Sequence, residues 1–362
     1  MKPIKTLGVM TSGGDCAGLN AAIRAVTLHA TQTYGWRVLG IHDGTLGLME
    51  QPRRYTELHA DAFTGRLLRE GGTVLGTTTQ GDPFRFPMPD GSLRDRSDEF
   101  AAGVRELDLD ALVVIGGDGS MRILARLCEY AGLGMVGIPK TIDNDVHGTM
   151  YAIGFMTAVN VVTDALDHLQ PTAASHHRVM ILETMGRDAG HIALSAGVAG
   201  GADVILIPEL RYTLDGVAAH LGRVMQRGTH ALMVVAEGVR TEDGRAVIAG
   251  GPEGHPRYGG IGHHLMQEIS ARSGAVARVT VLGHVQRGGV PSAIDRLLAS
   301  GFGVHAVDLA AQGRFGRMTV WQAGGVADLP LSEVTIGARC VAQDDPLIET
   351  ARALGIYVGE AR

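Results

Sequence analysis

The sequence has few cysteines, no long apolar run and no excess of basic residues, and each shortage excludes a class of protein. Its three cysteines are widely spaced and odd in number, which argues against a disulfide framework and favours a reducing compartment. No apolar run approaches the roughly 20 residues of a transmembrane helix. The net charge is −6 and the basic residues are dispersed, which disfavours nucleic-acid binding. We therefore expect a cytoplasmic protein.

Glycine, in contrast, is abundant. The 52 glycines among 362 residues are about twice the usual share of roughly 7%. They fall in clusters between apolar runs rather than in a repeat, which predicts many tight loops instead of a fibre. The length is sufficient for two domains of ordinary size.

Short apolar runs alternate with helical patterns along most of the chain, which predicts βαβ units with parallel sheets and helices on both faces. The predicted strands are residues 6–10, 37–41, 111–115, 135–138, 179–184, 204–207 and 231–236. The predicted helices are residues 19–33, 97–107, 120–131, 153–169, 190–199, 214–226, 260–273 and 292–311. We interpret residues 82–95 as an irregular connector and residues 250–260 as a surface loop or lid.

The most informative segment follows the predicted strand 135–138. It brings Lys140, Thr141, Asp143 and Asp145 within six residues. In open α/β sheets, ligands bind at the carboxyl ends of the strands. Two carboxylates beside a cation and a hydroxyl are suited to a hydroxyl proton and a phosphate's charge, so the segment predicts a phosphoryl-transfer site.

A glycine-rich turn, residues 11–20, joins the first predicted strand to the first predicted helix. Gly13 and Gly14 would let the backbone approach a polyanion, and the helix amino terminus would add unsatisfied N–H donors. A tight βα turn requires glycine in any case, so this loop alone is weak evidence. Its spacing matches neither a P-loop nor a dinucleotide fingerprint.

A second glycine turn of the same kind follows the predicted strand 111–115, and it contains an acid. Within Gly117, Asp118, Gly119 and Ser120, the Asp118 carboxylate could reach Mg²⁺ bound to phosphate oxygens. The alternative is that Asp118 merely caps the next helix. Two such loops in one sheet favour the phosphate interpretation.

Two further segments, residues 175–187 and 278–289, look like anion clamps. They are rich in arginine and histidine beside glycine, a combination suited to a sugar phosphate. Glu237, at the end of a predicted strand, could accept hydrogen bonds from a sugar hydroxyl, although it could equally be a solvated strand end. The residues of interest in the two clamps are Arg178, Met185, Gly186, Arg187, Arg278, His284 and Arg287.

Together these motifs resemble 6-phosphofructokinases of the bacterial type. The resemblance runs in order from Thr11 to about Ala311. Four motifs match closely: the first glycine loop, Gly-Gly-Asp-Gly-Ser, Thr-Ile-Asp-Asn-Asp and Leu-Gly-His-Val-Gln-Arg-Gly-Gly. The combination of all four motifs in order is highly specific, and a chance match is not a serious competitor.

The resemblance implies an α/β fold of two Rossmann-like three-layer α/β/α domains with mostly parallel sheets and the active site in the cleft between them. The larger domain, residues 1–152 plus about 286–335, would bind the phosphoryl donor. The smaller domain, residues 153–285 plus about 336–362, would bind the sugar phosphate. The implied reaction is phosphoryl transfer from Mg-ATP to the 1-hydroxyl of fructose 6-phosphate in glycolysis.

The resemblance also implies residue roles. Asp143 would be the general base, with Thr141, Asp145 and Lys140 positioning the site and Arg187 stabilising the transferring phosphoryl group. The donor would be bound by Gly13, Gly14, Arg85, Gly117, Asp118, Gly119 and Ser120, with Asp118 holding Mg²⁺. The sugar phosphate would be bound by Thr141, Asp143, Arg178, Met185, Gly186, Arg187, Glu237, Arg278, His284 and Arg287. In the family, Arg178 and Arg278 act from a neighbouring subunit, which implies a homo-oligomer, commonly a tetramer.

Two departures from the family pattern concern the donor. Family members that use pyrophosphate typically carry Asp at the position of Gly119 and Lys at the position of Lys140. Members that use ATP typically carry Gly at both positions, so this chain is mixed. An Asp at 119 would repel the ATP α-phosphate, so Gly119 favours ATP. ATP enzymes also often carry an aromatic residue near Thr45 and an Arg near Thr79; both are missing, and Arg85 could substitute for the second.

Another departure from the family pattern concerns regulation. Arg24 is kept at the family's effector site, but Leu28 and Gln170 replace basic neighbours, so we expect weak or absent regulation by ADP or phosphoenolpyruvate.

A pyrophosphate-dependent phosphotransferase remains the main alternative. Gly-Gly-Asp-Gly alone would also fit an NAD kinase or a lipid kinase. A non-catalytic sensor is disfavoured because the catalytic and metal-binding acids are present.

Overall fold

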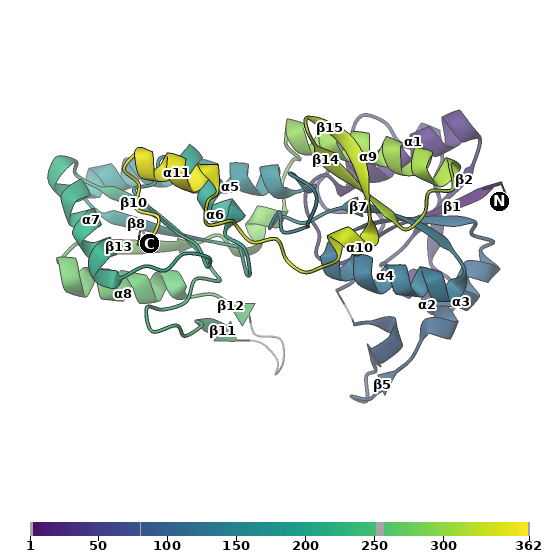
Figure 1. Ribbon diagram of the computed structural model, residues 1–362, viewed down its shortest axis with the longest axis horizontal. Helices are drawn as coiled ribbons and strands as arrows, with labels where there is room; N and C mark the ends of the chain where they lie inside the picture. The colour runs from purple at the N-terminus through teal and green to yellow at the C-terminus, as the bar shows by residue number, and fades with distance from the viewer. Residues whose placement is uncertain (1–2, 80, 251–256, 361–362) are drawn as a thin grey trace. The chain divides into compact units, whose positions relative to one another are not determined.

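The computed structural model describes residues 3–79, 81–250 and 257–360, which form two compact units (Figure 1). Unit 1 contains the described residues of Met1–Ile142, Val146–Thr157 and Arg287–Ala338. Unit 2 contains the described residues of Asp143–Asp145, Ala158–Gln286 and Arg339–Arg362. Each unit has its own sheet.

The sheet of unit 1 has seven strands in the order β15-β14-β7-β6-β1-β2-β3. The five central strands run parallel, and β3 and β15 are antiparallel edges. The strands are β1 (Thr6–Thr11), β2 (Arg37–Ile41), β3 (Tyr55–Glu57), β6 (Ala111–Gly116), β7 (Gly134–Pro139), β14 (Arg317–Gln322) and β15 (Gly325–Pro330). All residues of β1 and β6 are buried, as in a parallel strand covered on both faces.

Helices cover both faces of this sheet. Helices α1 and α9 pack together on one face, and α2, α3, α4 and α10 cover the other (Figure 1). Their bounds are α1 (Leu19–Tyr34), α2 (Leu46–Met49), α3 (Ser97–Glu106), α4 (Asp118–Ala131), α9 (Ala293–Ala311) and α10 (Leu331–Val334). The short 3-10 helices η1 (Ala60–Ala62), η2 (Leu67–Arg69) and η3 (Pro83–Arg85) and the two-stranded pair β4 (Phe86–Pro87) and β5 (Leu93–Arg94) lie in the connections.

The sheet of unit 2 has four parallel strands in the order β13-β8-β10-β9. The strands are β8 (Val179–Thr184), β9 (Val204–Leu206), β10 (Ala231–Ala236) and β13 (Ala277–Val281), with a separate hairpin of β11 (Ile248–Gly250) and β12 (Arg257–Tyr258). The helices are α5 (Phe155–His176), α6 (His191–Ala199), α7 (Leu214–Arg227), α8 (Ile261–Ser273), α11 (Pro346–Ala353) and the 3-10 helix η4 (Gly283–Arg287). Helices α6 and α11 cover one face of this sheet and α7 and α8 the other (Figure 1).

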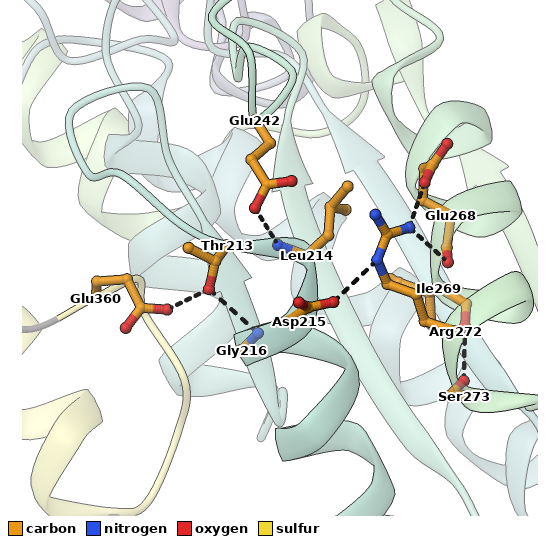
Figure 2. Close-up of polar contacts among 10 residues, drawn as sticks. All are labelled: Thr213, Leu214, Asp215, Gly216, Glu242, Glu268, Ile269, Arg272, Ser273 and Glu360. Atoms are coloured by element: carbon orange, nitrogen blue, oxygen red, sulfur yellow. Dashed lines mark hydrogen bonds and ion pairs between the residues drawn. The ribbon is translucent and has the colours of Figure 1, made fainter.

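The start of α7 is held by side chains from three segments of unit 2 (Figure 2). Thr213 caps the helix, because its hydroxyl accepts a hydrogen bond from the Gly216 N–H at 3.2 Å. The Glu242 carboxylate accepts from the Leu214 N–H at 3.0 Å. Glu360 accepts from the Thr213 hydroxyl at 2.7 Å, which ties the end of the chain to this helix.

Two boundaries between the units differ from the sequence expectation. Residues 153–157 belong to unit 1 because Ile153 pairs with Lys140 and the buried Asp295 carboxylate accepts hydrogen bonds from the Gly154 and Thr157 N–H groups. Residues 143–145 belong to unit 2 because the Arg339 guanidinium donates to the Asn144 carbonyl oxygen at 2.7 Å. Which unit binds the donor and which binds the sugar stays a prediction.

The predicted two-domain α/β/α class is confirmed, and every predicted strand and helix has a counterpart. The expected helix 153–169 is longer than predicted, because α5 continues past Pro171 to His176. The sequence patterns missed β13 and the β14–β15 hairpin, and the connector 82–95 contains η3, β4 and β5. Most of the predicted 250–260 loop lies outside the described residues. Among the described helices, none has the length and apolar character required to span a membrane.

Candidate functional site

In unit 1 the two glycine loops and the start of the Lys140 segment meet at one edge of the sheet. Strands β1, β6 and β7 are adjacent and parallel, so their carboxyl ends lie together. The Ser12 N–H donates to the Ile115 carbonyl at 3.0 Å, and the Lys140 N–H donates to the Gly116 carbonyl at 2.9 Å. Backbone hydrogen bonds therefore lock the first glycine loop, the second glycine loop and the Lys140 segment together.

Side chains reinforce this contact around Gly13. The Ser12 and Ser120 hydroxyls lie 3.0 Å apart, and a Cβ at Gly13 would lie 3.1 Å from the Ser120 Oγ and 3.3 Å from the Lys140 Nζ. Gly13 has φ +86°, which favours glycine. The Lys140 ammonium donates to the Gly14 carbonyl and only 3% of the residue is exposed. A buried cation thus lies directly against a glycine loop.

A pocket of about 230 Å³ opens beside this loop in unit 1. It is lined by Ser12, Gly13, Thr45, Thr78, Thr79, Gly81, Pro83, Gly119, Ser120, Ile123 and Leu124. Gly119 is the second residue of α4, and a Cβ added there would meet no atom within 4 Å. The pocket therefore combines a helix amino terminus, hydroxyl groups and an apolar wall, which is suitable for a nucleotide polyphosphate.

Part of this lining gives no signal in the sequence. Thr45 and Thr79 stand out only as replacements for other residue types, and Ile123 belongs to none of the motifs. The side chain of Arg85 is exposed and does not line the pocket, whereas Pro83 from the same turn does. The turn therefore presents its proline, and not Arg85, to this pocket, and the expected contact of Arg85 with the donor stays a prediction.

Asp118 begins α4 at the same edge. The N-cap residue is Gly117, which has no side chain to cap the helix. Asp118 Oδ2 accepts a hydrogen bond from the Arg122 guanidinium. Its other oxygen, Oδ1, is buried and accepts no hydrogen bond from any described residue. An orphaned buried carboxylate oxygen fits a cation. Since the described residues contain no cluster of three or more metal-binding side chains, the remaining ligands would be phosphate oxygens and water.

In unit 2 a second set of predicted residues meets at the carboxyl ends of β8, β10 and β13. The Glu237 N–H donates to the Thr184 carbonyl at 2.8 Å, and the Gly238 N–H donates to the Gly186 carbonyl at 3.1 Å. The Met185 N–H donates to the Gln286 side chain at 3.2 Å. Met185, Gly186, Glu237 and the η4 turn carrying His284 are thus brought together, and their contacts with a sugar phosphate stay a prediction.

Gln286 was not singled out from the sequence, although it lies in the His-Val-Gln-Arg motif. It is 1% exposed, and its amide also donates to the Gly283 carbonyl at 2.9 Å. The buried amide therefore joins the loop after β8 to the turn after β13. Its neighbour Arg287 belongs to unit 1, where its guanidinium donates to the Asp15 carbonyl oxygen at 2.9 Å. Arg287 thus contacts the first glycine loop.

Arg178 and Arg278 are not part of this cluster. Arg178 immediately precedes β8, and Arg278 is the second residue of β13 and pairs with Met180. Both therefore lie toward the amino ends of their strands, whereas Met185 and His284 follow the carboxyl ends. The structure does not bring these two arginines to the edge that carries the other predicted sugar-binding residues of this chain.

The acidic segment after β7 crosses from unit 1 to unit 2. Thr141, in unit 1, donates its N–H to the Ile153 carbonyl at 3.1 Å. In unit 2, Asn144 adopts φ +53°, and the Arg339 N–H donates to the Asp145 carbonyl at 2.6 Å. The partly buried Asp143 and Asp145 therefore flank a turn that Arg339 holds. Only the fold reveals this arginine, which is nearly 200 residues away in sequence.

Burial and charge around Arg339 perturb two groups of unit 2. Burial lowers the pKa of the Arg339 guanidinium, and the neighbouring Asp145 opposes this change. Burial, together with the positive charge of Arg339, lowers the pKa of His191 to about 4. His191 Nε2 lies 3.1 Å from the Arg339 carbonyl oxygen, so a neutral imidazole can donate to it. His191 therefore supports the arginine without adding a second positive charge.

Comparisons with known proteins find a matching family model and similar sequences. A family model described as Phosphofructokinase matches residues 6–310. The chain is 54% identical over 361 residues to a Nostoc sp. protein named ATP-dependent 6-phosphofructokinase 1, covering 99% of this chain and 100% of that protein.

Solved structures give the same picture of the fold. Pichia pastoris phosphofructokinase in the T-state aligns with a TM-score of 0.79 and 31% identity over 92% of this chain and 38% of that one, so this chain spans about two fifths of it. A pyrophosphate-dependent phosphofructokinase from Marinobacter aquaeolei aligns with a TM-score of 0.79 and 21% identity over 99% of this chain and 89% of that one. At 21% identity the second likeness concerns the fold alone.

Proposed function

The chain belongs to the phosphofructokinase family, and from this premise we propose that it transfers the γ-phosphoryl group of ATP to the 1-hydroxyl of fructose 6-phosphate. The product is fructose 1,6-bisphosphate, and the reaction is a step of glycolysis. The observation that carries the choice of donor is the open space at Gly119 beside the pocket of about 230 Å³. A carboxylate at position 119 would repel the α-phosphate of ATP, and this chain has glycine at that position.

On the donor side, the residues of unit 1 bind and neutralise phosphate. The N–H groups of Gly13, Gly14 and the start of α4 face the polyphosphate, and Ser120 adds a hydroxyl. The buried Lys140 ammonium supplies a positive charge beside the first glycine loop. In phosphoryl transfer most of the acceleration comes from such positioning and charge neutralisation, so these contacts lower the barrier without covalent chemistry.

Asp118 is suited to hold Mg²⁺ together with the phosphate oxygens, since its Oδ1 is buried and accepts no hydrogen bond among the described residues. The ion, when bound, screens the charge between the donor's phosphate oxygens. Asp118 Oδ2 accepts a hydrogen bond from Arg122, so Oδ1 would be the oxygen left for the cation.

On the acceptor side, Asp143 accepts the proton of the sugar's 1-hydroxyl and thereby orients the attacking oxygen. Thr141 and Asp145 position this segment, and the Arg339 contact holds its turn in shape. Arg187 stabilises the negative charge of the transferring phosphoryl group. The sugar phosphate itself is bound by Met185, Gly186, Glu237, His284 and Arg287.

Arg178 and Arg278 complete the sugar-phosphate site of a neighbouring copy, so the enzyme is a homo-oligomer, with a tetramer as the expected form. Support comes from their place toward the amino ends of β8 and β13, away from the cluster in their own chain.

Because Arg24 donates to the Phe63 carbonyl at 3.2 Å and Gln170 replaces a basic neighbour, we expect little response to ADP or phosphoenolpyruvate. The three free cysteines and the glycolytic substrates fit the cytoplasm.

A pyrophosphate-dependent transferase is the second candidate, and the observation that favours it is Lys140, which family members using pyrophosphate also carry. Coupled assays with Mg-ATP and with Mg-pyrophosphate, each with fructose 6-phosphate, separate the two. We expect kcat/KM with ATP to exceed that with pyrophosphate by at least ~10²-fold. Pyrophosphate lacks the α-phosphate and the adenosine of ATP, and a factor of this size is expected when several such contacts are lost. A higher kcat/KM with pyrophosphate would overturn the choice of ATP.

A further inference from the structure

Arg187 is held loosely by its own loop. Its backbone is fixed, because the loop packs so closely on Gly238 that a Cβ there would come within 2.0 Å of the Arg187 carbonyl oxygen. Its side chain, however, is 55% exposed, and its Nε lies 3.6 Å from the carboxylate of Asp188, which is 61% exposed. An exposed ion pair of this kind stabilises a side-chain position very little. The direction of the guanidinium therefore depends on another contact.

That contact is an aromatic ring from the β11–β12 hairpin. The Arg187 Cζ lies 5.4 Å from the centroid of the Tyr258 ring. At this distance a guanidinium is attracted to the face of a tyrosine ring. Tyr258 is the last residue of β12 and pairs with Ile248 of β11 across the hairpin. The ring thus reaches Arg187 from a segment about 70 residues further along the chain.

One buried carboxylate fixes the ring and the arginine in the same frame. Glu183 is 1% exposed and lies in β8, the strand that leads directly into the Arg187 loop. Its two oxygens accept hydrogen bonds from the Gly260 N–H at 2.9 Å and the Gly262 N–H at 2.8 Å. Gly260 follows Tyr258 by two residues. Glu183 therefore ties the end of the hairpin to the strand that carries Arg187.

Resting on the proposed function, we propose that Tyr258 is a positioning residue that holds the Arg187 guanidinium in the direction needed for the transferring phosphoryl group. Strand β12 then belongs to the phosphoryl-transfer apparatus of unit 2. Tyr258 acts through Arg187 and needs no contact with either substrate. Its loss should lower kcat while leaving substrate affinity nearly unchanged, because Arg187 acts on charge that develops in the transition state.

The test compares two substitutions of the ring. Tyr258→Leu should lower kcat by ~3- to 10-fold, the size of one partly exposed cation–π contact, with each KM changed by less than about twofold. Tyr258→Phe keeps the ring face and should retain at least about half of the wild-type kcat. Ile248→Ala disturbs the opposite strand without removing the ring, and its kcat should stay within about twofold of wild type. Equal losses for Tyr258→Leu and Tyr258→Phe would overturn the proposal.

A double-mutant cycle separates this inference from the function on which it rests. In an Arg187→Ala background, Tyr258→Leu should cause no further loss of kcat, because the residue it positions is gone. A full additional loss in that background would overturn the positioning role. If Arg187→Ala lowers kcat and Tyr258→Leu does not, the inference fails and the proposed function stands. If Arg187→Ala leaves kcat unchanged, the proposed role of Arg187 fails, and the inference fails with it.

Discussion

The functional edges of the two units are built by different means. In unit 1 the edge is made of backbone and buried groups, with Lys140 only 3% exposed and two glycine loops locked by hydrogen bonds. In unit 2 the edge is joined by the buried Gln286 amide but also carries exposed side chains, such as Arg187 with 55% of its side chain exposed. The difference suits a polyphosphate bound by backbone N–H groups on one unit and a sugar phosphate bound by side chains on the other. Substitutions should therefore act through the pocket beside the glycine loops in unit 1 and through individual side chains in unit 2.

The largest effect should come from the acid of unit 2. Asp143→Asn removes the proton acceptor while keeping the size of the side chain, so kcat should fall by roughly 10²–10⁴-fold with little change in the KM for fructose 6-phosphate. Steady-state kinetics with Mg-ATP measures this. Asp215→Asn is the matched control, because this acid of unit 2 is 94% exposed and contacts Arg272 on the surface. An unchanged kcat for Asp143→Asn would remove Asp143 from the role of base.

The next effect tests the pocket of unit 1. Gly119→Asp places a carboxylate in the open space beside the pocket, so kcat/KM for ATP should fall by roughly 10²-fold through repulsion of the α-phosphate. Any activity with pyrophosphate, which has no α-phosphate, should change far less. Gly222→Asp, on α7 of unit 2, is the control because a Cβ there also meets no atom within 4 Å. Equal losses with both donors would contradict the argument from the α-phosphate.

The last effect concerns the stability of unit 2 and not its activity. The folded chain holds the pKa of His191 at about 4, below its ordinary value of 6.5, so the unfolded chain binds a proton that the folded chain does not. Stability should therefore fall as the pH drops from about 6.5 to about 4. Urea unfolding of wild type and His191→Gln across this range measures the difference. An identical pH dependence in both would show that His191 is not the source.

Local patterns predicted much of both units, because glycine turns after buried strands carry their own signal. Gly13, Asp118 and Lys140 could be assigned to one edge of a sheet, since parallel strands place their carboxyl ends together. Contacts between distant segments could not be predicted in the same way. Nothing local to Arg339 indicates that it holds the turn at Asn144, and Tyr258 lies in a short hairpin whose pattern resembles a loop. The short strand β13 was missed because arginine interrupts its apolar run.

The central claim is that unit 1 binds the nucleotide and unit 2 binds the sugar phosphate. Hydrogen exchange with one ligand at a time tests this claim most directly. Saturating Mg²⁺ with a non-hydrolysable ATP analogue should protect the backbone amides of residues 12–18 and 117–120 in unit 1. Saturating fructose 6-phosphate should instead protect residues 185–190 and 237–239 in unit 2. Protection of the unit 1 loops by the sugar phosphate, with the nucleotide analogue protecting only unit 2, would contradict the account.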